Sequence, residues 1–129
     1  MLIGRQLVKV VRLAWRQAGE PDDLTVGLVH LVFDDGRGLL LAGRSDWTLK
    51  IVETHPGDDS WLTDYDYDYD GGRWLSRDAS NELPFASVIG GSLVGLASIP
   101  NECDEVVGLM LEFVGQTLAL RMWQGEVTA

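Results

Sequence analysis

Three aspartates at alternate positions form the stretch of this sequence whose spacing most resembles a metal site. Asp66, Asp68 and Asp70 are followed by Gly71, which is how the calcium-binding loop of an EF-hand begins. The twelfth position of such a loop should be a glutamate but is Arg77, and no amphipathic helix precedes the aspartates. The sequence therefore argues against an EF-hand and leaves a calcium site at Asp66, Asp68 and Asp70 as an alternative.

The same stretch has a second interpretation, because it alternates aspartate with tyrosine. Residues 64–70, the acidic run, read Asp-Tyr-Asp-Tyr-Asp-Tyr-Asp and hold every tyrosine of the chain. In an extended ribbon the tyrosines would lie on one face and the aspartates on the other. Tyrosine is favoured at protein interfaces, and unpaired carboxylates steer a basic partner. We therefore predict that a basic protein partner is bound by Asp64, Tyr65, Asp66, Tyr67, Asp68, Tyr69 and Asp70.

The charge of the chain is strongly negative and unevenly distributed. Its 129 residues include 20 acidic and 10 basic ones, a formal net charge of −10. Residues 53–82 hold nine acids and two arginines, whereas residues 1–16 hold four basic residues and no acid. Binding of phosphates requires a basic field, so a nucleic-acid partner is disfavoured. The chain has no apolar run long enough to span a membrane, so we expect no membrane partner.

Residue combinations that carry out catalysis are scarce. The two histidines are His30, within an apolar run, and His55, before a proline. A structural, hydrogen-bonded His30 is the simpler interpretation, since no nucleophile motif, Cys/His metal-ligand spacing or phosphate loop accompanies it. We therefore predict a protein that is not an enzyme and has no cofactor. The single cysteine, Cys103, and an N-terminus without the layout of a signal peptide predict a cytoplasmic protein.

The pattern of apolar residues predicts mostly β structure. Residues 26–33 are apolar on both faces, as in a central strand, and residues 34–38 read Asp-Asp-Gly-Arg-Gly, a hairpin turn. Residues 39–42 would form the second strand of this hairpin. Apolar and polar residues alternate in residues 47–53, which predicts a further strand. The basic residues within 3–13 have helical spacing, but the valines there favour a strand.

The second half of the chain resembles the first in its pattern of apolar residues and glycines. Residues 89–99 match residues 3–13 at an offset of 86, and a second group matches at an offset of 80. The matched positions are Ile3 with Ile89, Gly4 with Gly90, Leu7 with Leu93, Val8 with Val94, Val10 with Leu96 and Leu13 with Ile99, then Val29 with Leu109, Leu31 with Leu111 and Phe33 with Phe113. The second copy contains Gly95 and ends at Pro100, which makes a poor helix and favours strands in both copies. Duplication and chance similarity between alternating strands both fit two copies.

Together these patterns predict one domain, residues 1–129, of the α+β class that is mostly β. We expect two antiparallel β-meanders, residues 3–53 and 89–129, that form a sandwich or a partly open barrel of about six to eight strands. Residues 54–88 would form an acidic connector. Its end could hold one short helix, with Pro84 in the first turn and Gly90 just past the last.

Several short stretches resemble small bacterial β-rich domains of unknown function, some of which resemble immunity proteins of bacterial toxin systems. The stretches are Ile-Gly-x-x-Leu-Val at residues 3–8, Val-Phe-Asp-Asp-Gly-x-Gly-Leu-x-Leu at residues 32–41, Asp-Trp-Thr-Leu at residues 46–49, and the acidic middle. The resemblance implies a bacterial protein that binds and blocks a cognate toxin without catalysis.

Overall fold

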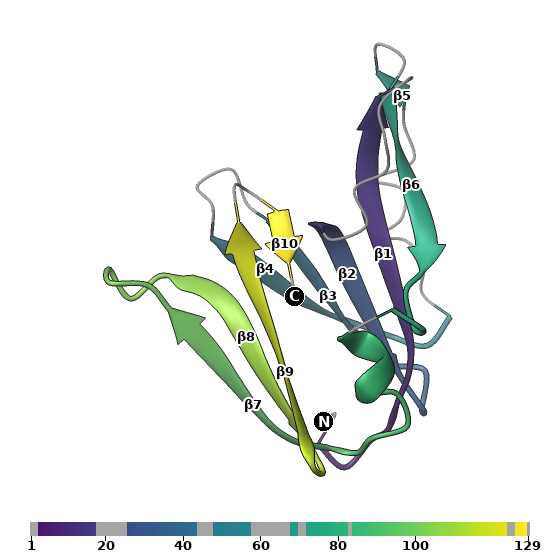
Figure 1. Cartoon of the computed structure of the whole chain (residues 1–129), viewed down its shortest axis with the longest axis vertical. Coiled ribbons are helices and arrows are strands. Elements are labelled where there is room, and N and C mark those ends of the chain that lie inside the picture. The colour runs from purple at the N-terminus through teal and green to yellow at the C-terminus, as the bar shows by residue number, and fades with distance from the viewer. Residues whose placement is uncertain are drawn as a thin grey trace.

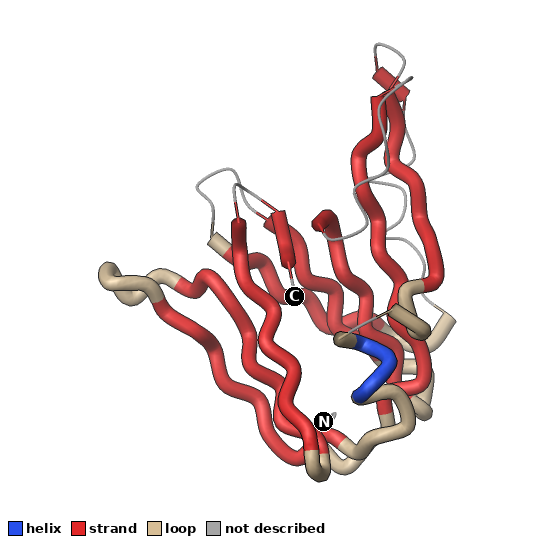
Figure 2. Tube along the Cα trace, viewed as in Figure 1, coloured by secondary structure: helices blue, strands red, loops and turns tan. Residues whose placement is uncertain are grey.

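Almost every described residue with regular structure is in a β-strand (Figures 1 and 2). The computed structural model describes residues 3–17, 26–43, 48–57, 68–69, 72–82, 84–123 and 126–128. Its strands are β1 (Leu7–Gln17), β2 (Val26–Phe33), β3 (Gly38–Gly43), β4 (Leu49–Thr54), β5 (Asp68–Tyr69), β6 (Gly72–Asp78), β7 (Leu93–Pro100), β8 (Val106–Phe113), β9 (Gln116–Trp123) and β10 (Glu126–Thr128). The predicted mostly β class is confirmed.

The strands form two antiparallel sheets, each built around one meander. The first sheet has the order β4-β3-β2-β1-β6-β5, and the second has the order β7-β8-β9-β10. Each meander follows from local chemistry, because alternating apolar strands are separated by short turns. Gly36 and Gly115 have φ of 86° and 80° in the two central turns, a conformation that glycine adopts without a steric penalty.

The two sheets are joined at both ends of their packed faces. On one side β10 pairs with the start of β2, at Val26 and Gly27, while β3 pairs with β2 from Val29 onward. On the other side the residues before β1 meet the start of β7 through a bridge between Gln6 and Ser92. In the described part of the chain the strands do not form a closed barrel. The sheets instead converge near the N-terminus and diverge away from it (Figure 1).

The hydrophobic core lies between the two sheets and takes residues from both. Because side chains alternate along a strand, one face of β1, β2 and β3 packs against one face of β8 and β9. Fully buried side chains from the two sheets and the connector include Leu7, Leu31, Phe33, Phe85, Leu111 and Leu120. Apolar burial of this kind is the dominant favourable term in folding.

The two copies found in the sequence are structurally equivalent. Each first strand is bulged at the same place, as the register on either side of the bulge shows: Leu7 with Phe33 and Lys9 with Val32 in one copy, Leu93 with Phe113 and Gly95 with Glu112 in the other. After the bulge the equivalent pairs continue as Val10 with Leu31, and Leu96 with Leu111. Bulges are specific local features, so a shared bulge supports duplication over chance.

A reciprocal set of hydrogen bonds joins the copies where β1 and β7 begin. Gly4 and Gly90 have φ of 90° and 82°, and each donates its backbone N–H across to the other copy. The four bonds form two matched pairs: Gly4 N to Leu93 O at 2.7 Å and Gly90 N to Leu7 O at 2.7 Å, with Leu93 N to Arg5 O at 2.9 Å and Leu7 N to Gly91 O at 3.1 Å. The two copies are therefore related by approximate twofold symmetry at this junction.

The connector contains more regular structure than its sequence pattern predicts. β6 pairs with β1 from Val11 opposite Asp78 to Gln17 opposite Gly72, whereas the pairs between β1 and β2 end at Leu13. The outer part of β1 and β6 therefore projects as a two-stranded ribbon beyond the core, with β5 at its far end (Figure 1). We call this projection the β1–β6 ribbon.

The predicted short helix at the end of the connector is a single turn of 3-10 helix, η2 (Phe85–Ser87). Pro84 is the N-cap residue rather than part of the first turn, and the helix ends at Ser87, three residues before Gly90, so the predicted helix is longer than the observed one. The turn inserts Phe85, which is 1% exposed, into the core. Apolar burial rather than helix propensity stabilises so short a turn.

Candidate functional site

The far end of the β1–β6 ribbon carries the described part of the acidic run. Asp68 and Tyr69 form β5, which pairs with Arg73 and Gly72 of β6. These two residues have the extended conformation that the ribbon interpretation predicts. The other residues predicted to bind a partner, Asp64, Tyr65, Asp66, Tyr67 and Asp70, lie outside the described residues.

The register of the ribbon sets acidic and basic positions side by side. Asp68 is opposite Arg73, and Arg73 is opposite Arg16 on β1. Opposed positions on neighbouring antiparallel strands lie on the same face of a sheet. An aspartate position of the acidic run therefore neighbours the position of Arg73, which in turn neighbours that of Arg16.

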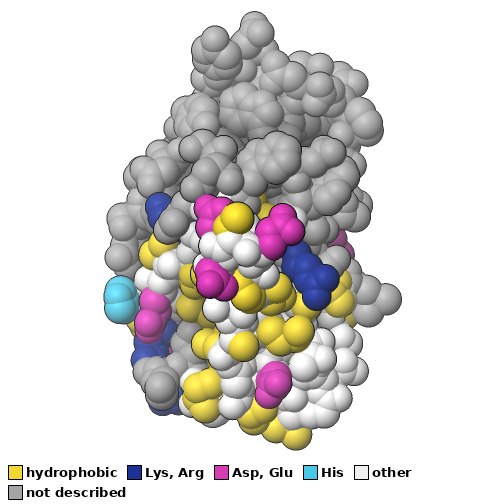
Figure 3. All heavy atoms as spheres, turned by 90° about the vertical axis from the view of Figure 1, so that its left-hand side faces the viewer, with side chains coloured by type: hydrophobic (Ala, Val, Ile, Leu, Met, Phe, Trp, Pro, Cys, Tyr) yellow, Lys and Arg dark blue, Asp and Glu magenta, His cyan; other side chains and the backbone are white. Residues whose placement is uncertain are grey.

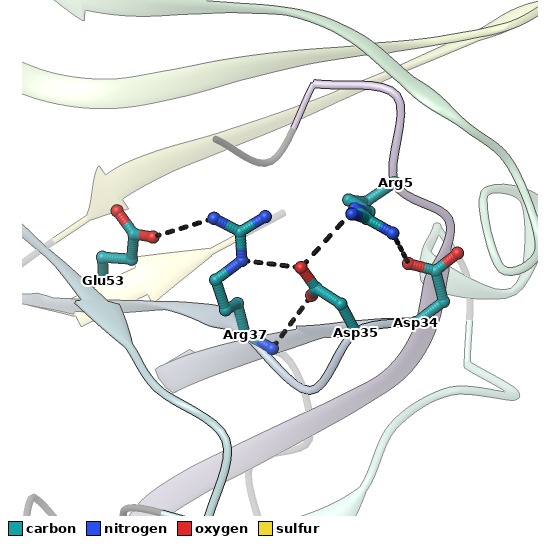
Figure 4. Close-up of polar contacts among 5 residues, drawn as sticks. All are labelled: Arg5, Asp34, Asp35, Arg37 and Glu53. Atoms are coloured by element: carbon teal, nitrogen blue, oxygen red, sulfur yellow. Dashed lines mark hydrogen bonds and ion pairs between the residues drawn. The ribbon is translucent and has the colours of Figure 1, made fainter.

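A second group of charged side chains surrounds the hairpin between β2 and β3 (Figure 4). Asp35 is central to it: its Oδ2 lies 2.6 Å from Nε of Arg37 and 3.5 Å from Nε of Arg5, and its Oδ1 accepts the backbone N–H of Arg37 at 3.1 Å. Longer contacts of 4.0 Å link Arg5 to Asp34 and Arg37 to Glu53 on β4. We call Arg5, Asp34, Asp35, Arg37 and Glu53 the hairpin charge cluster.

The hairpin charge cluster stabilises the charged form of Asp35. Desolvation raises the pKa of this carboxyl, but the hydrogen bonds from the side chain and backbone of Arg37, together with the charges of Arg37 and Arg5, outweigh it and hold the pKa below its ordinary value. A carboxyl group held ionised by two arginines is a poor proton donor or acceptor near neutral pH. The ion pairs of the cluster therefore link the residues before β1, the hairpin between β2 and β3, and β4.

A second carboxyl, that of Asp78 at the end of β6, also has a lowered pKa. The hydroxyl and the backbone N–H of Ser80 both donate hydrogen bonds to Asp78, and the bond from the backbone N–H is 2.9 Å long. These two bonds and the charge of Lys9 lower the pKa of Asp78, against a smaller opposing effect of desolvation. Ser80 Oγ also accepts the backbone N–H of Val10 at 2.9 Å. The pair therefore fastens the end of β6 to the edge of β1.

His30 has the structural environment that its place in an apolar strand predicts. Its Nε2 lies 2.8 Å from Oγ1 of Thr54, and the two side chains meet above Gly38. A Cβ at Gly38 would lie 2.8 Å from His30 Nε2 and 2.7 Å from Thr54 Oγ1. The histidine thus links β2 to β4 across a glycine of β3, which satisfies its ring where it is half buried.

Arg12 is a buried charge that sequence reasoning did not single out. It is 2% exposed, its Nη2 donates to the backbone oxygen of Val127 at 2.6 Å, and its guanidinium carbon lies 5.6 Å from the centre of the Phe85 ring. A hydrogen bond from a charged group and a cation–π contact compensate part of its desolvation. The spacing of basic residues gave no signal, because burial here depends on β10 and η2, which are distant in sequence.

The described residues contain no group of three or more histidine, cysteine, aspartate or glutamate side chains arranged to hold a metal ion. Of the predicted calcium ligands, Asp68 lies in β5, while Asp66 and Asp70 are outside the described part of the chain. No helix among the described residues is long and apolar enough to cross a membrane.

The chain matches no known protein family, curated protein or solved structure.

Proposed function

We propose that this protein is a non-catalytic module that binds a basic protein partner through its acidic run, residues 64–70. The observation that carries the proposal is the position of β5, the described part of the run, at the far end of the β1–β6 ribbon. A segment held away from the core presents its side chains to a partner without disturbing the packed sheets. Partner-binding residues are commonly carried on segments positioned by a rigid scaffold.

Charge supports the same proposal. Residues 53–82 carry nine of the 20 acidic residues of the chain but two of its 10 basic ones. A concentrated negative field speeds encounter with a basic surface and disfavours acidic competitors. Three tyrosines between the aspartates would add contact area that charge alone does not provide.

We further propose that the module is of the immunity type, so that binding neutralises the activity of a basic partner in the bacterial cytoplasm. The fold fits this role, since two packed sheets provide a stable support for the ribbon. In this proposal the two sheets form a partly open sandwich within one domain. The ribbon would be its interaction arm.

The test is a titration with oligolysine, a probe of basic character, followed by fluorescence anisotropy of the labelled peptide. A run variant with Asp64, Asp66, Asp68 and Asp70 changed to Asn should bind about tenfold more weakly at about 150 mM salt. The matched control changes four acids elsewhere in the sequence, Glu20 to Gln and Asp22, Asp23 and Asp46 to Asn, and should lose less than about threefold. Equal losses in the two variants would contradict a site at the acidic run.

The calcium alternative at Asp66, Asp68 and Asp70 has less support from the geometry. A calcium loop curls its carboxylates around one point, whereas Asp68 and Tyr69 are extended and paired with β6. A calcium titration monitored by calorimetry and thermal melting separates the two proposals. Heat release together with a higher melting temperature at micromolar calcium would favour the cation site.

A further inference from the structure

The outer edge of β7 is an apolar strand edge on the side of the molecule opposite the β1–β6 ribbon. Among the described strands β8 is the one that pairs along the length of β7, and the contact with residues 4–6 ends at Leu93. The strand reads Leu-Val-Gly-Leu-Ala-Ser-Ile-Pro and has no charged residue. Val94 is 51% and Leu96 43% exposed. Natural proteins usually protect such an edge with charge or a covering segment.

Figure 3 shows this side of the molecule, where apolar side chains lie together among acidic and basic ones. Exposed carboxylates flank the strand: Glu102, Asp104 and Glu105 follow it in the hairpin to β8, and Glu112 lies beside Gly95. The Glu112 Oε2 is 3.2 Å from where a Cβ of Gly95 would be. The edge is thus apolar along its length and acidic around it.

The twofold relation between the copies shows how a strand would occupy this edge. Leu96 of β7 is equivalent to Val10 of β1, since both follow the bulge and pair with equivalent leucines. Val10 uses its outward backbone groups: its N–H donates to Ser80 Oγ at 2.9 Å, and its oxygen accepts the N–H of Ala79 at 2.8 Å. From Val11 onward β6 pairs with the same edge. The backbone N–H and C=O of Leu96 therefore point to the outer edge of β7.

The side chains at these two positions differ in their exposure, as expected if a covering segment is present over Val10 and absent over Leu96. Val10 is 0% exposed and belongs to the core cluster with Ala79, Phe85 and Val88, which all come from the connector. Leu96, at the equivalent position, is 43% exposed. In the first copy the connector supplies both the added strand and the apolar cover. In the described part of the second copy neither is present.

We propose that the outer edge of β7 binds an extended peptide segment of a basic partner, in which apolar residues alternate with lysine or arginine. Backbone hydrogen bonds to Leu96 and Ser98 would add the segment as a strand, and an apolar side chain would cover Leu96. The surrounding carboxylates select basic residues on the segment. The equivalent edge of β1 is already occupied by a strand, because β6 pairs with it from Val11 onward.

A second copy of this chain is a poorer occupant. Two copies would bring net charges of −10 together, with the four flanking acids of each copy close to the junction. Like charges at an interface oppose association. The proposal concerns a surface separate from the acidic run, so it goes beyond the proposed function and stands if that function fails.

The probe is a synthetic ten-residue peptide of alternating valine and lysine, and the control peptide alternates valine and glutamate. Binding is measured by anisotropy, and the surface is mapped by amide hydrogen exchange with and without peptide. We expect the valine–lysine peptide to slow exchange at Leu96 and Ser98, and the acidic peptide to leave both amides unchanged. A basic peptide that binds without protecting these amides would overturn the inference, as would equal binding of the acidic peptide.

Variants then separate the two surfaces. Leu96→Lys should weaken peptide binding about tenfold. The matched control is Ile51→Lys on β4, which is 38% exposed in the wild-type protein and lies on an edge strand that already carries Lys50 and Glu53. A loss of affinity in the acidic-run variant but not in Leu96→Lys would overturn the β7 site and support the run. Sedimentation showing a dimer that Leu96→Lys dissolves would instead make a second copy the occupant.

Discussion

Gly38 is the residue on which the junction of β2, β3 and β4 depends. A Cβ at this position would lie 2.5 Å from the backbone oxygen of Leu31, besides its approach to His30 and Thr54. We predict that Gly38→Ala lowers the free energy of unfolding by about 1–3 kcal/mol, because the neighbouring backbone cannot move aside easily. Urea denaturation followed by tryptophan fluorescence measures the change.

The matched control is Gly95→Ala on β7. A Cβ there meets the Glu112 side chain, whose nearest atom is 3.2 Å away at the flexible end of the chain. This change should alter stability by about 0.5 kcal/mol or less. Similar losses at both glycines would show that strand propensity, rather than the close approach at Gly38, sets the cost.

Asp35 gives the protein a specific dependence on acid. Its pKa is lowered from 3.8 in the folded state, so the ionised carboxylate stabilises the fold at pH values above 3.8. That contribution is lost as the pH falls through the lowered folded pKa. We predict that the stability difference between wild type and Asp35→Asn is largest near neutral pH and disappears in strong acid. Urea denaturation from about pH 6 to about pH 2 tests this, and a difference that persists or grows in acid would contradict it.

At the scale of elements, β1 and β7 are equivalent strands in unequal surroundings. We predict that Val10→Ala costs about 1–3 kcal/mol, because Val10 is fully buried under the connector. Leu96→Ala removes a larger side chain at the equivalent position but should cost less than about 1 kcal/mol, since Leu96 is already partly in water. Chemical denaturation of both variants provides the comparison. An equal or larger loss at Leu96 would mean that this side chain is covered in solution.

Elements defined by local pattern could be predicted from the sequence. The hairpin at residues 34–38 is encoded by its own glycines, and β2 and β8 by continuous apolar runs. The match of Leu7 with Leu93 and of Phe33 with Phe113 correctly aligned the two copies, since equivalent burial demands equivalent residues. These features need no information from distant parts of the chain.

Elements that depend on distant pairing could not be predicted. β6 has polar and apolar residues without a clear period, and it is a strand because β1 offers it an edge. The burial of Arg12 likewise requires the oxygen of Val127, 115 residues away. The acidic run is recognisable from its alternating aspartates and tyrosines, and of its residues Asp68 and Tyr69 are described in the structure.

At the scale of the whole molecule, the uneven charge predicts an unusual response to salt. The nine acids of residues 53–82 repel one another, and salt screens that repulsion. We predict that the melting temperature rises between about 20 mM and about 500 mM salt, and that the acidic-run variant shows a smaller rise. The variant with changes at Glu20, Asp22, Asp23 and Asp46 should keep most of the rise. Equal salt dependence of the two variants would contradict a repulsive centre at the run.

The sharing of β2 among β1, β3 and β10 has a consequence for how the chain acquires its structure. β1 pairs with β2 from Leu28 onward and β3 from Val29 onward, so Val26 and Gly27 pair with β10, which β9 brings back from the opposite half. Such contacts between remote segments slow the search for the native arrangement and couple its parts. We therefore expect that neither half forms a stable folding intermediate by itself. The pairing of β10 with Val26 and Gly27 should form in the same cooperative transition as the two sheets.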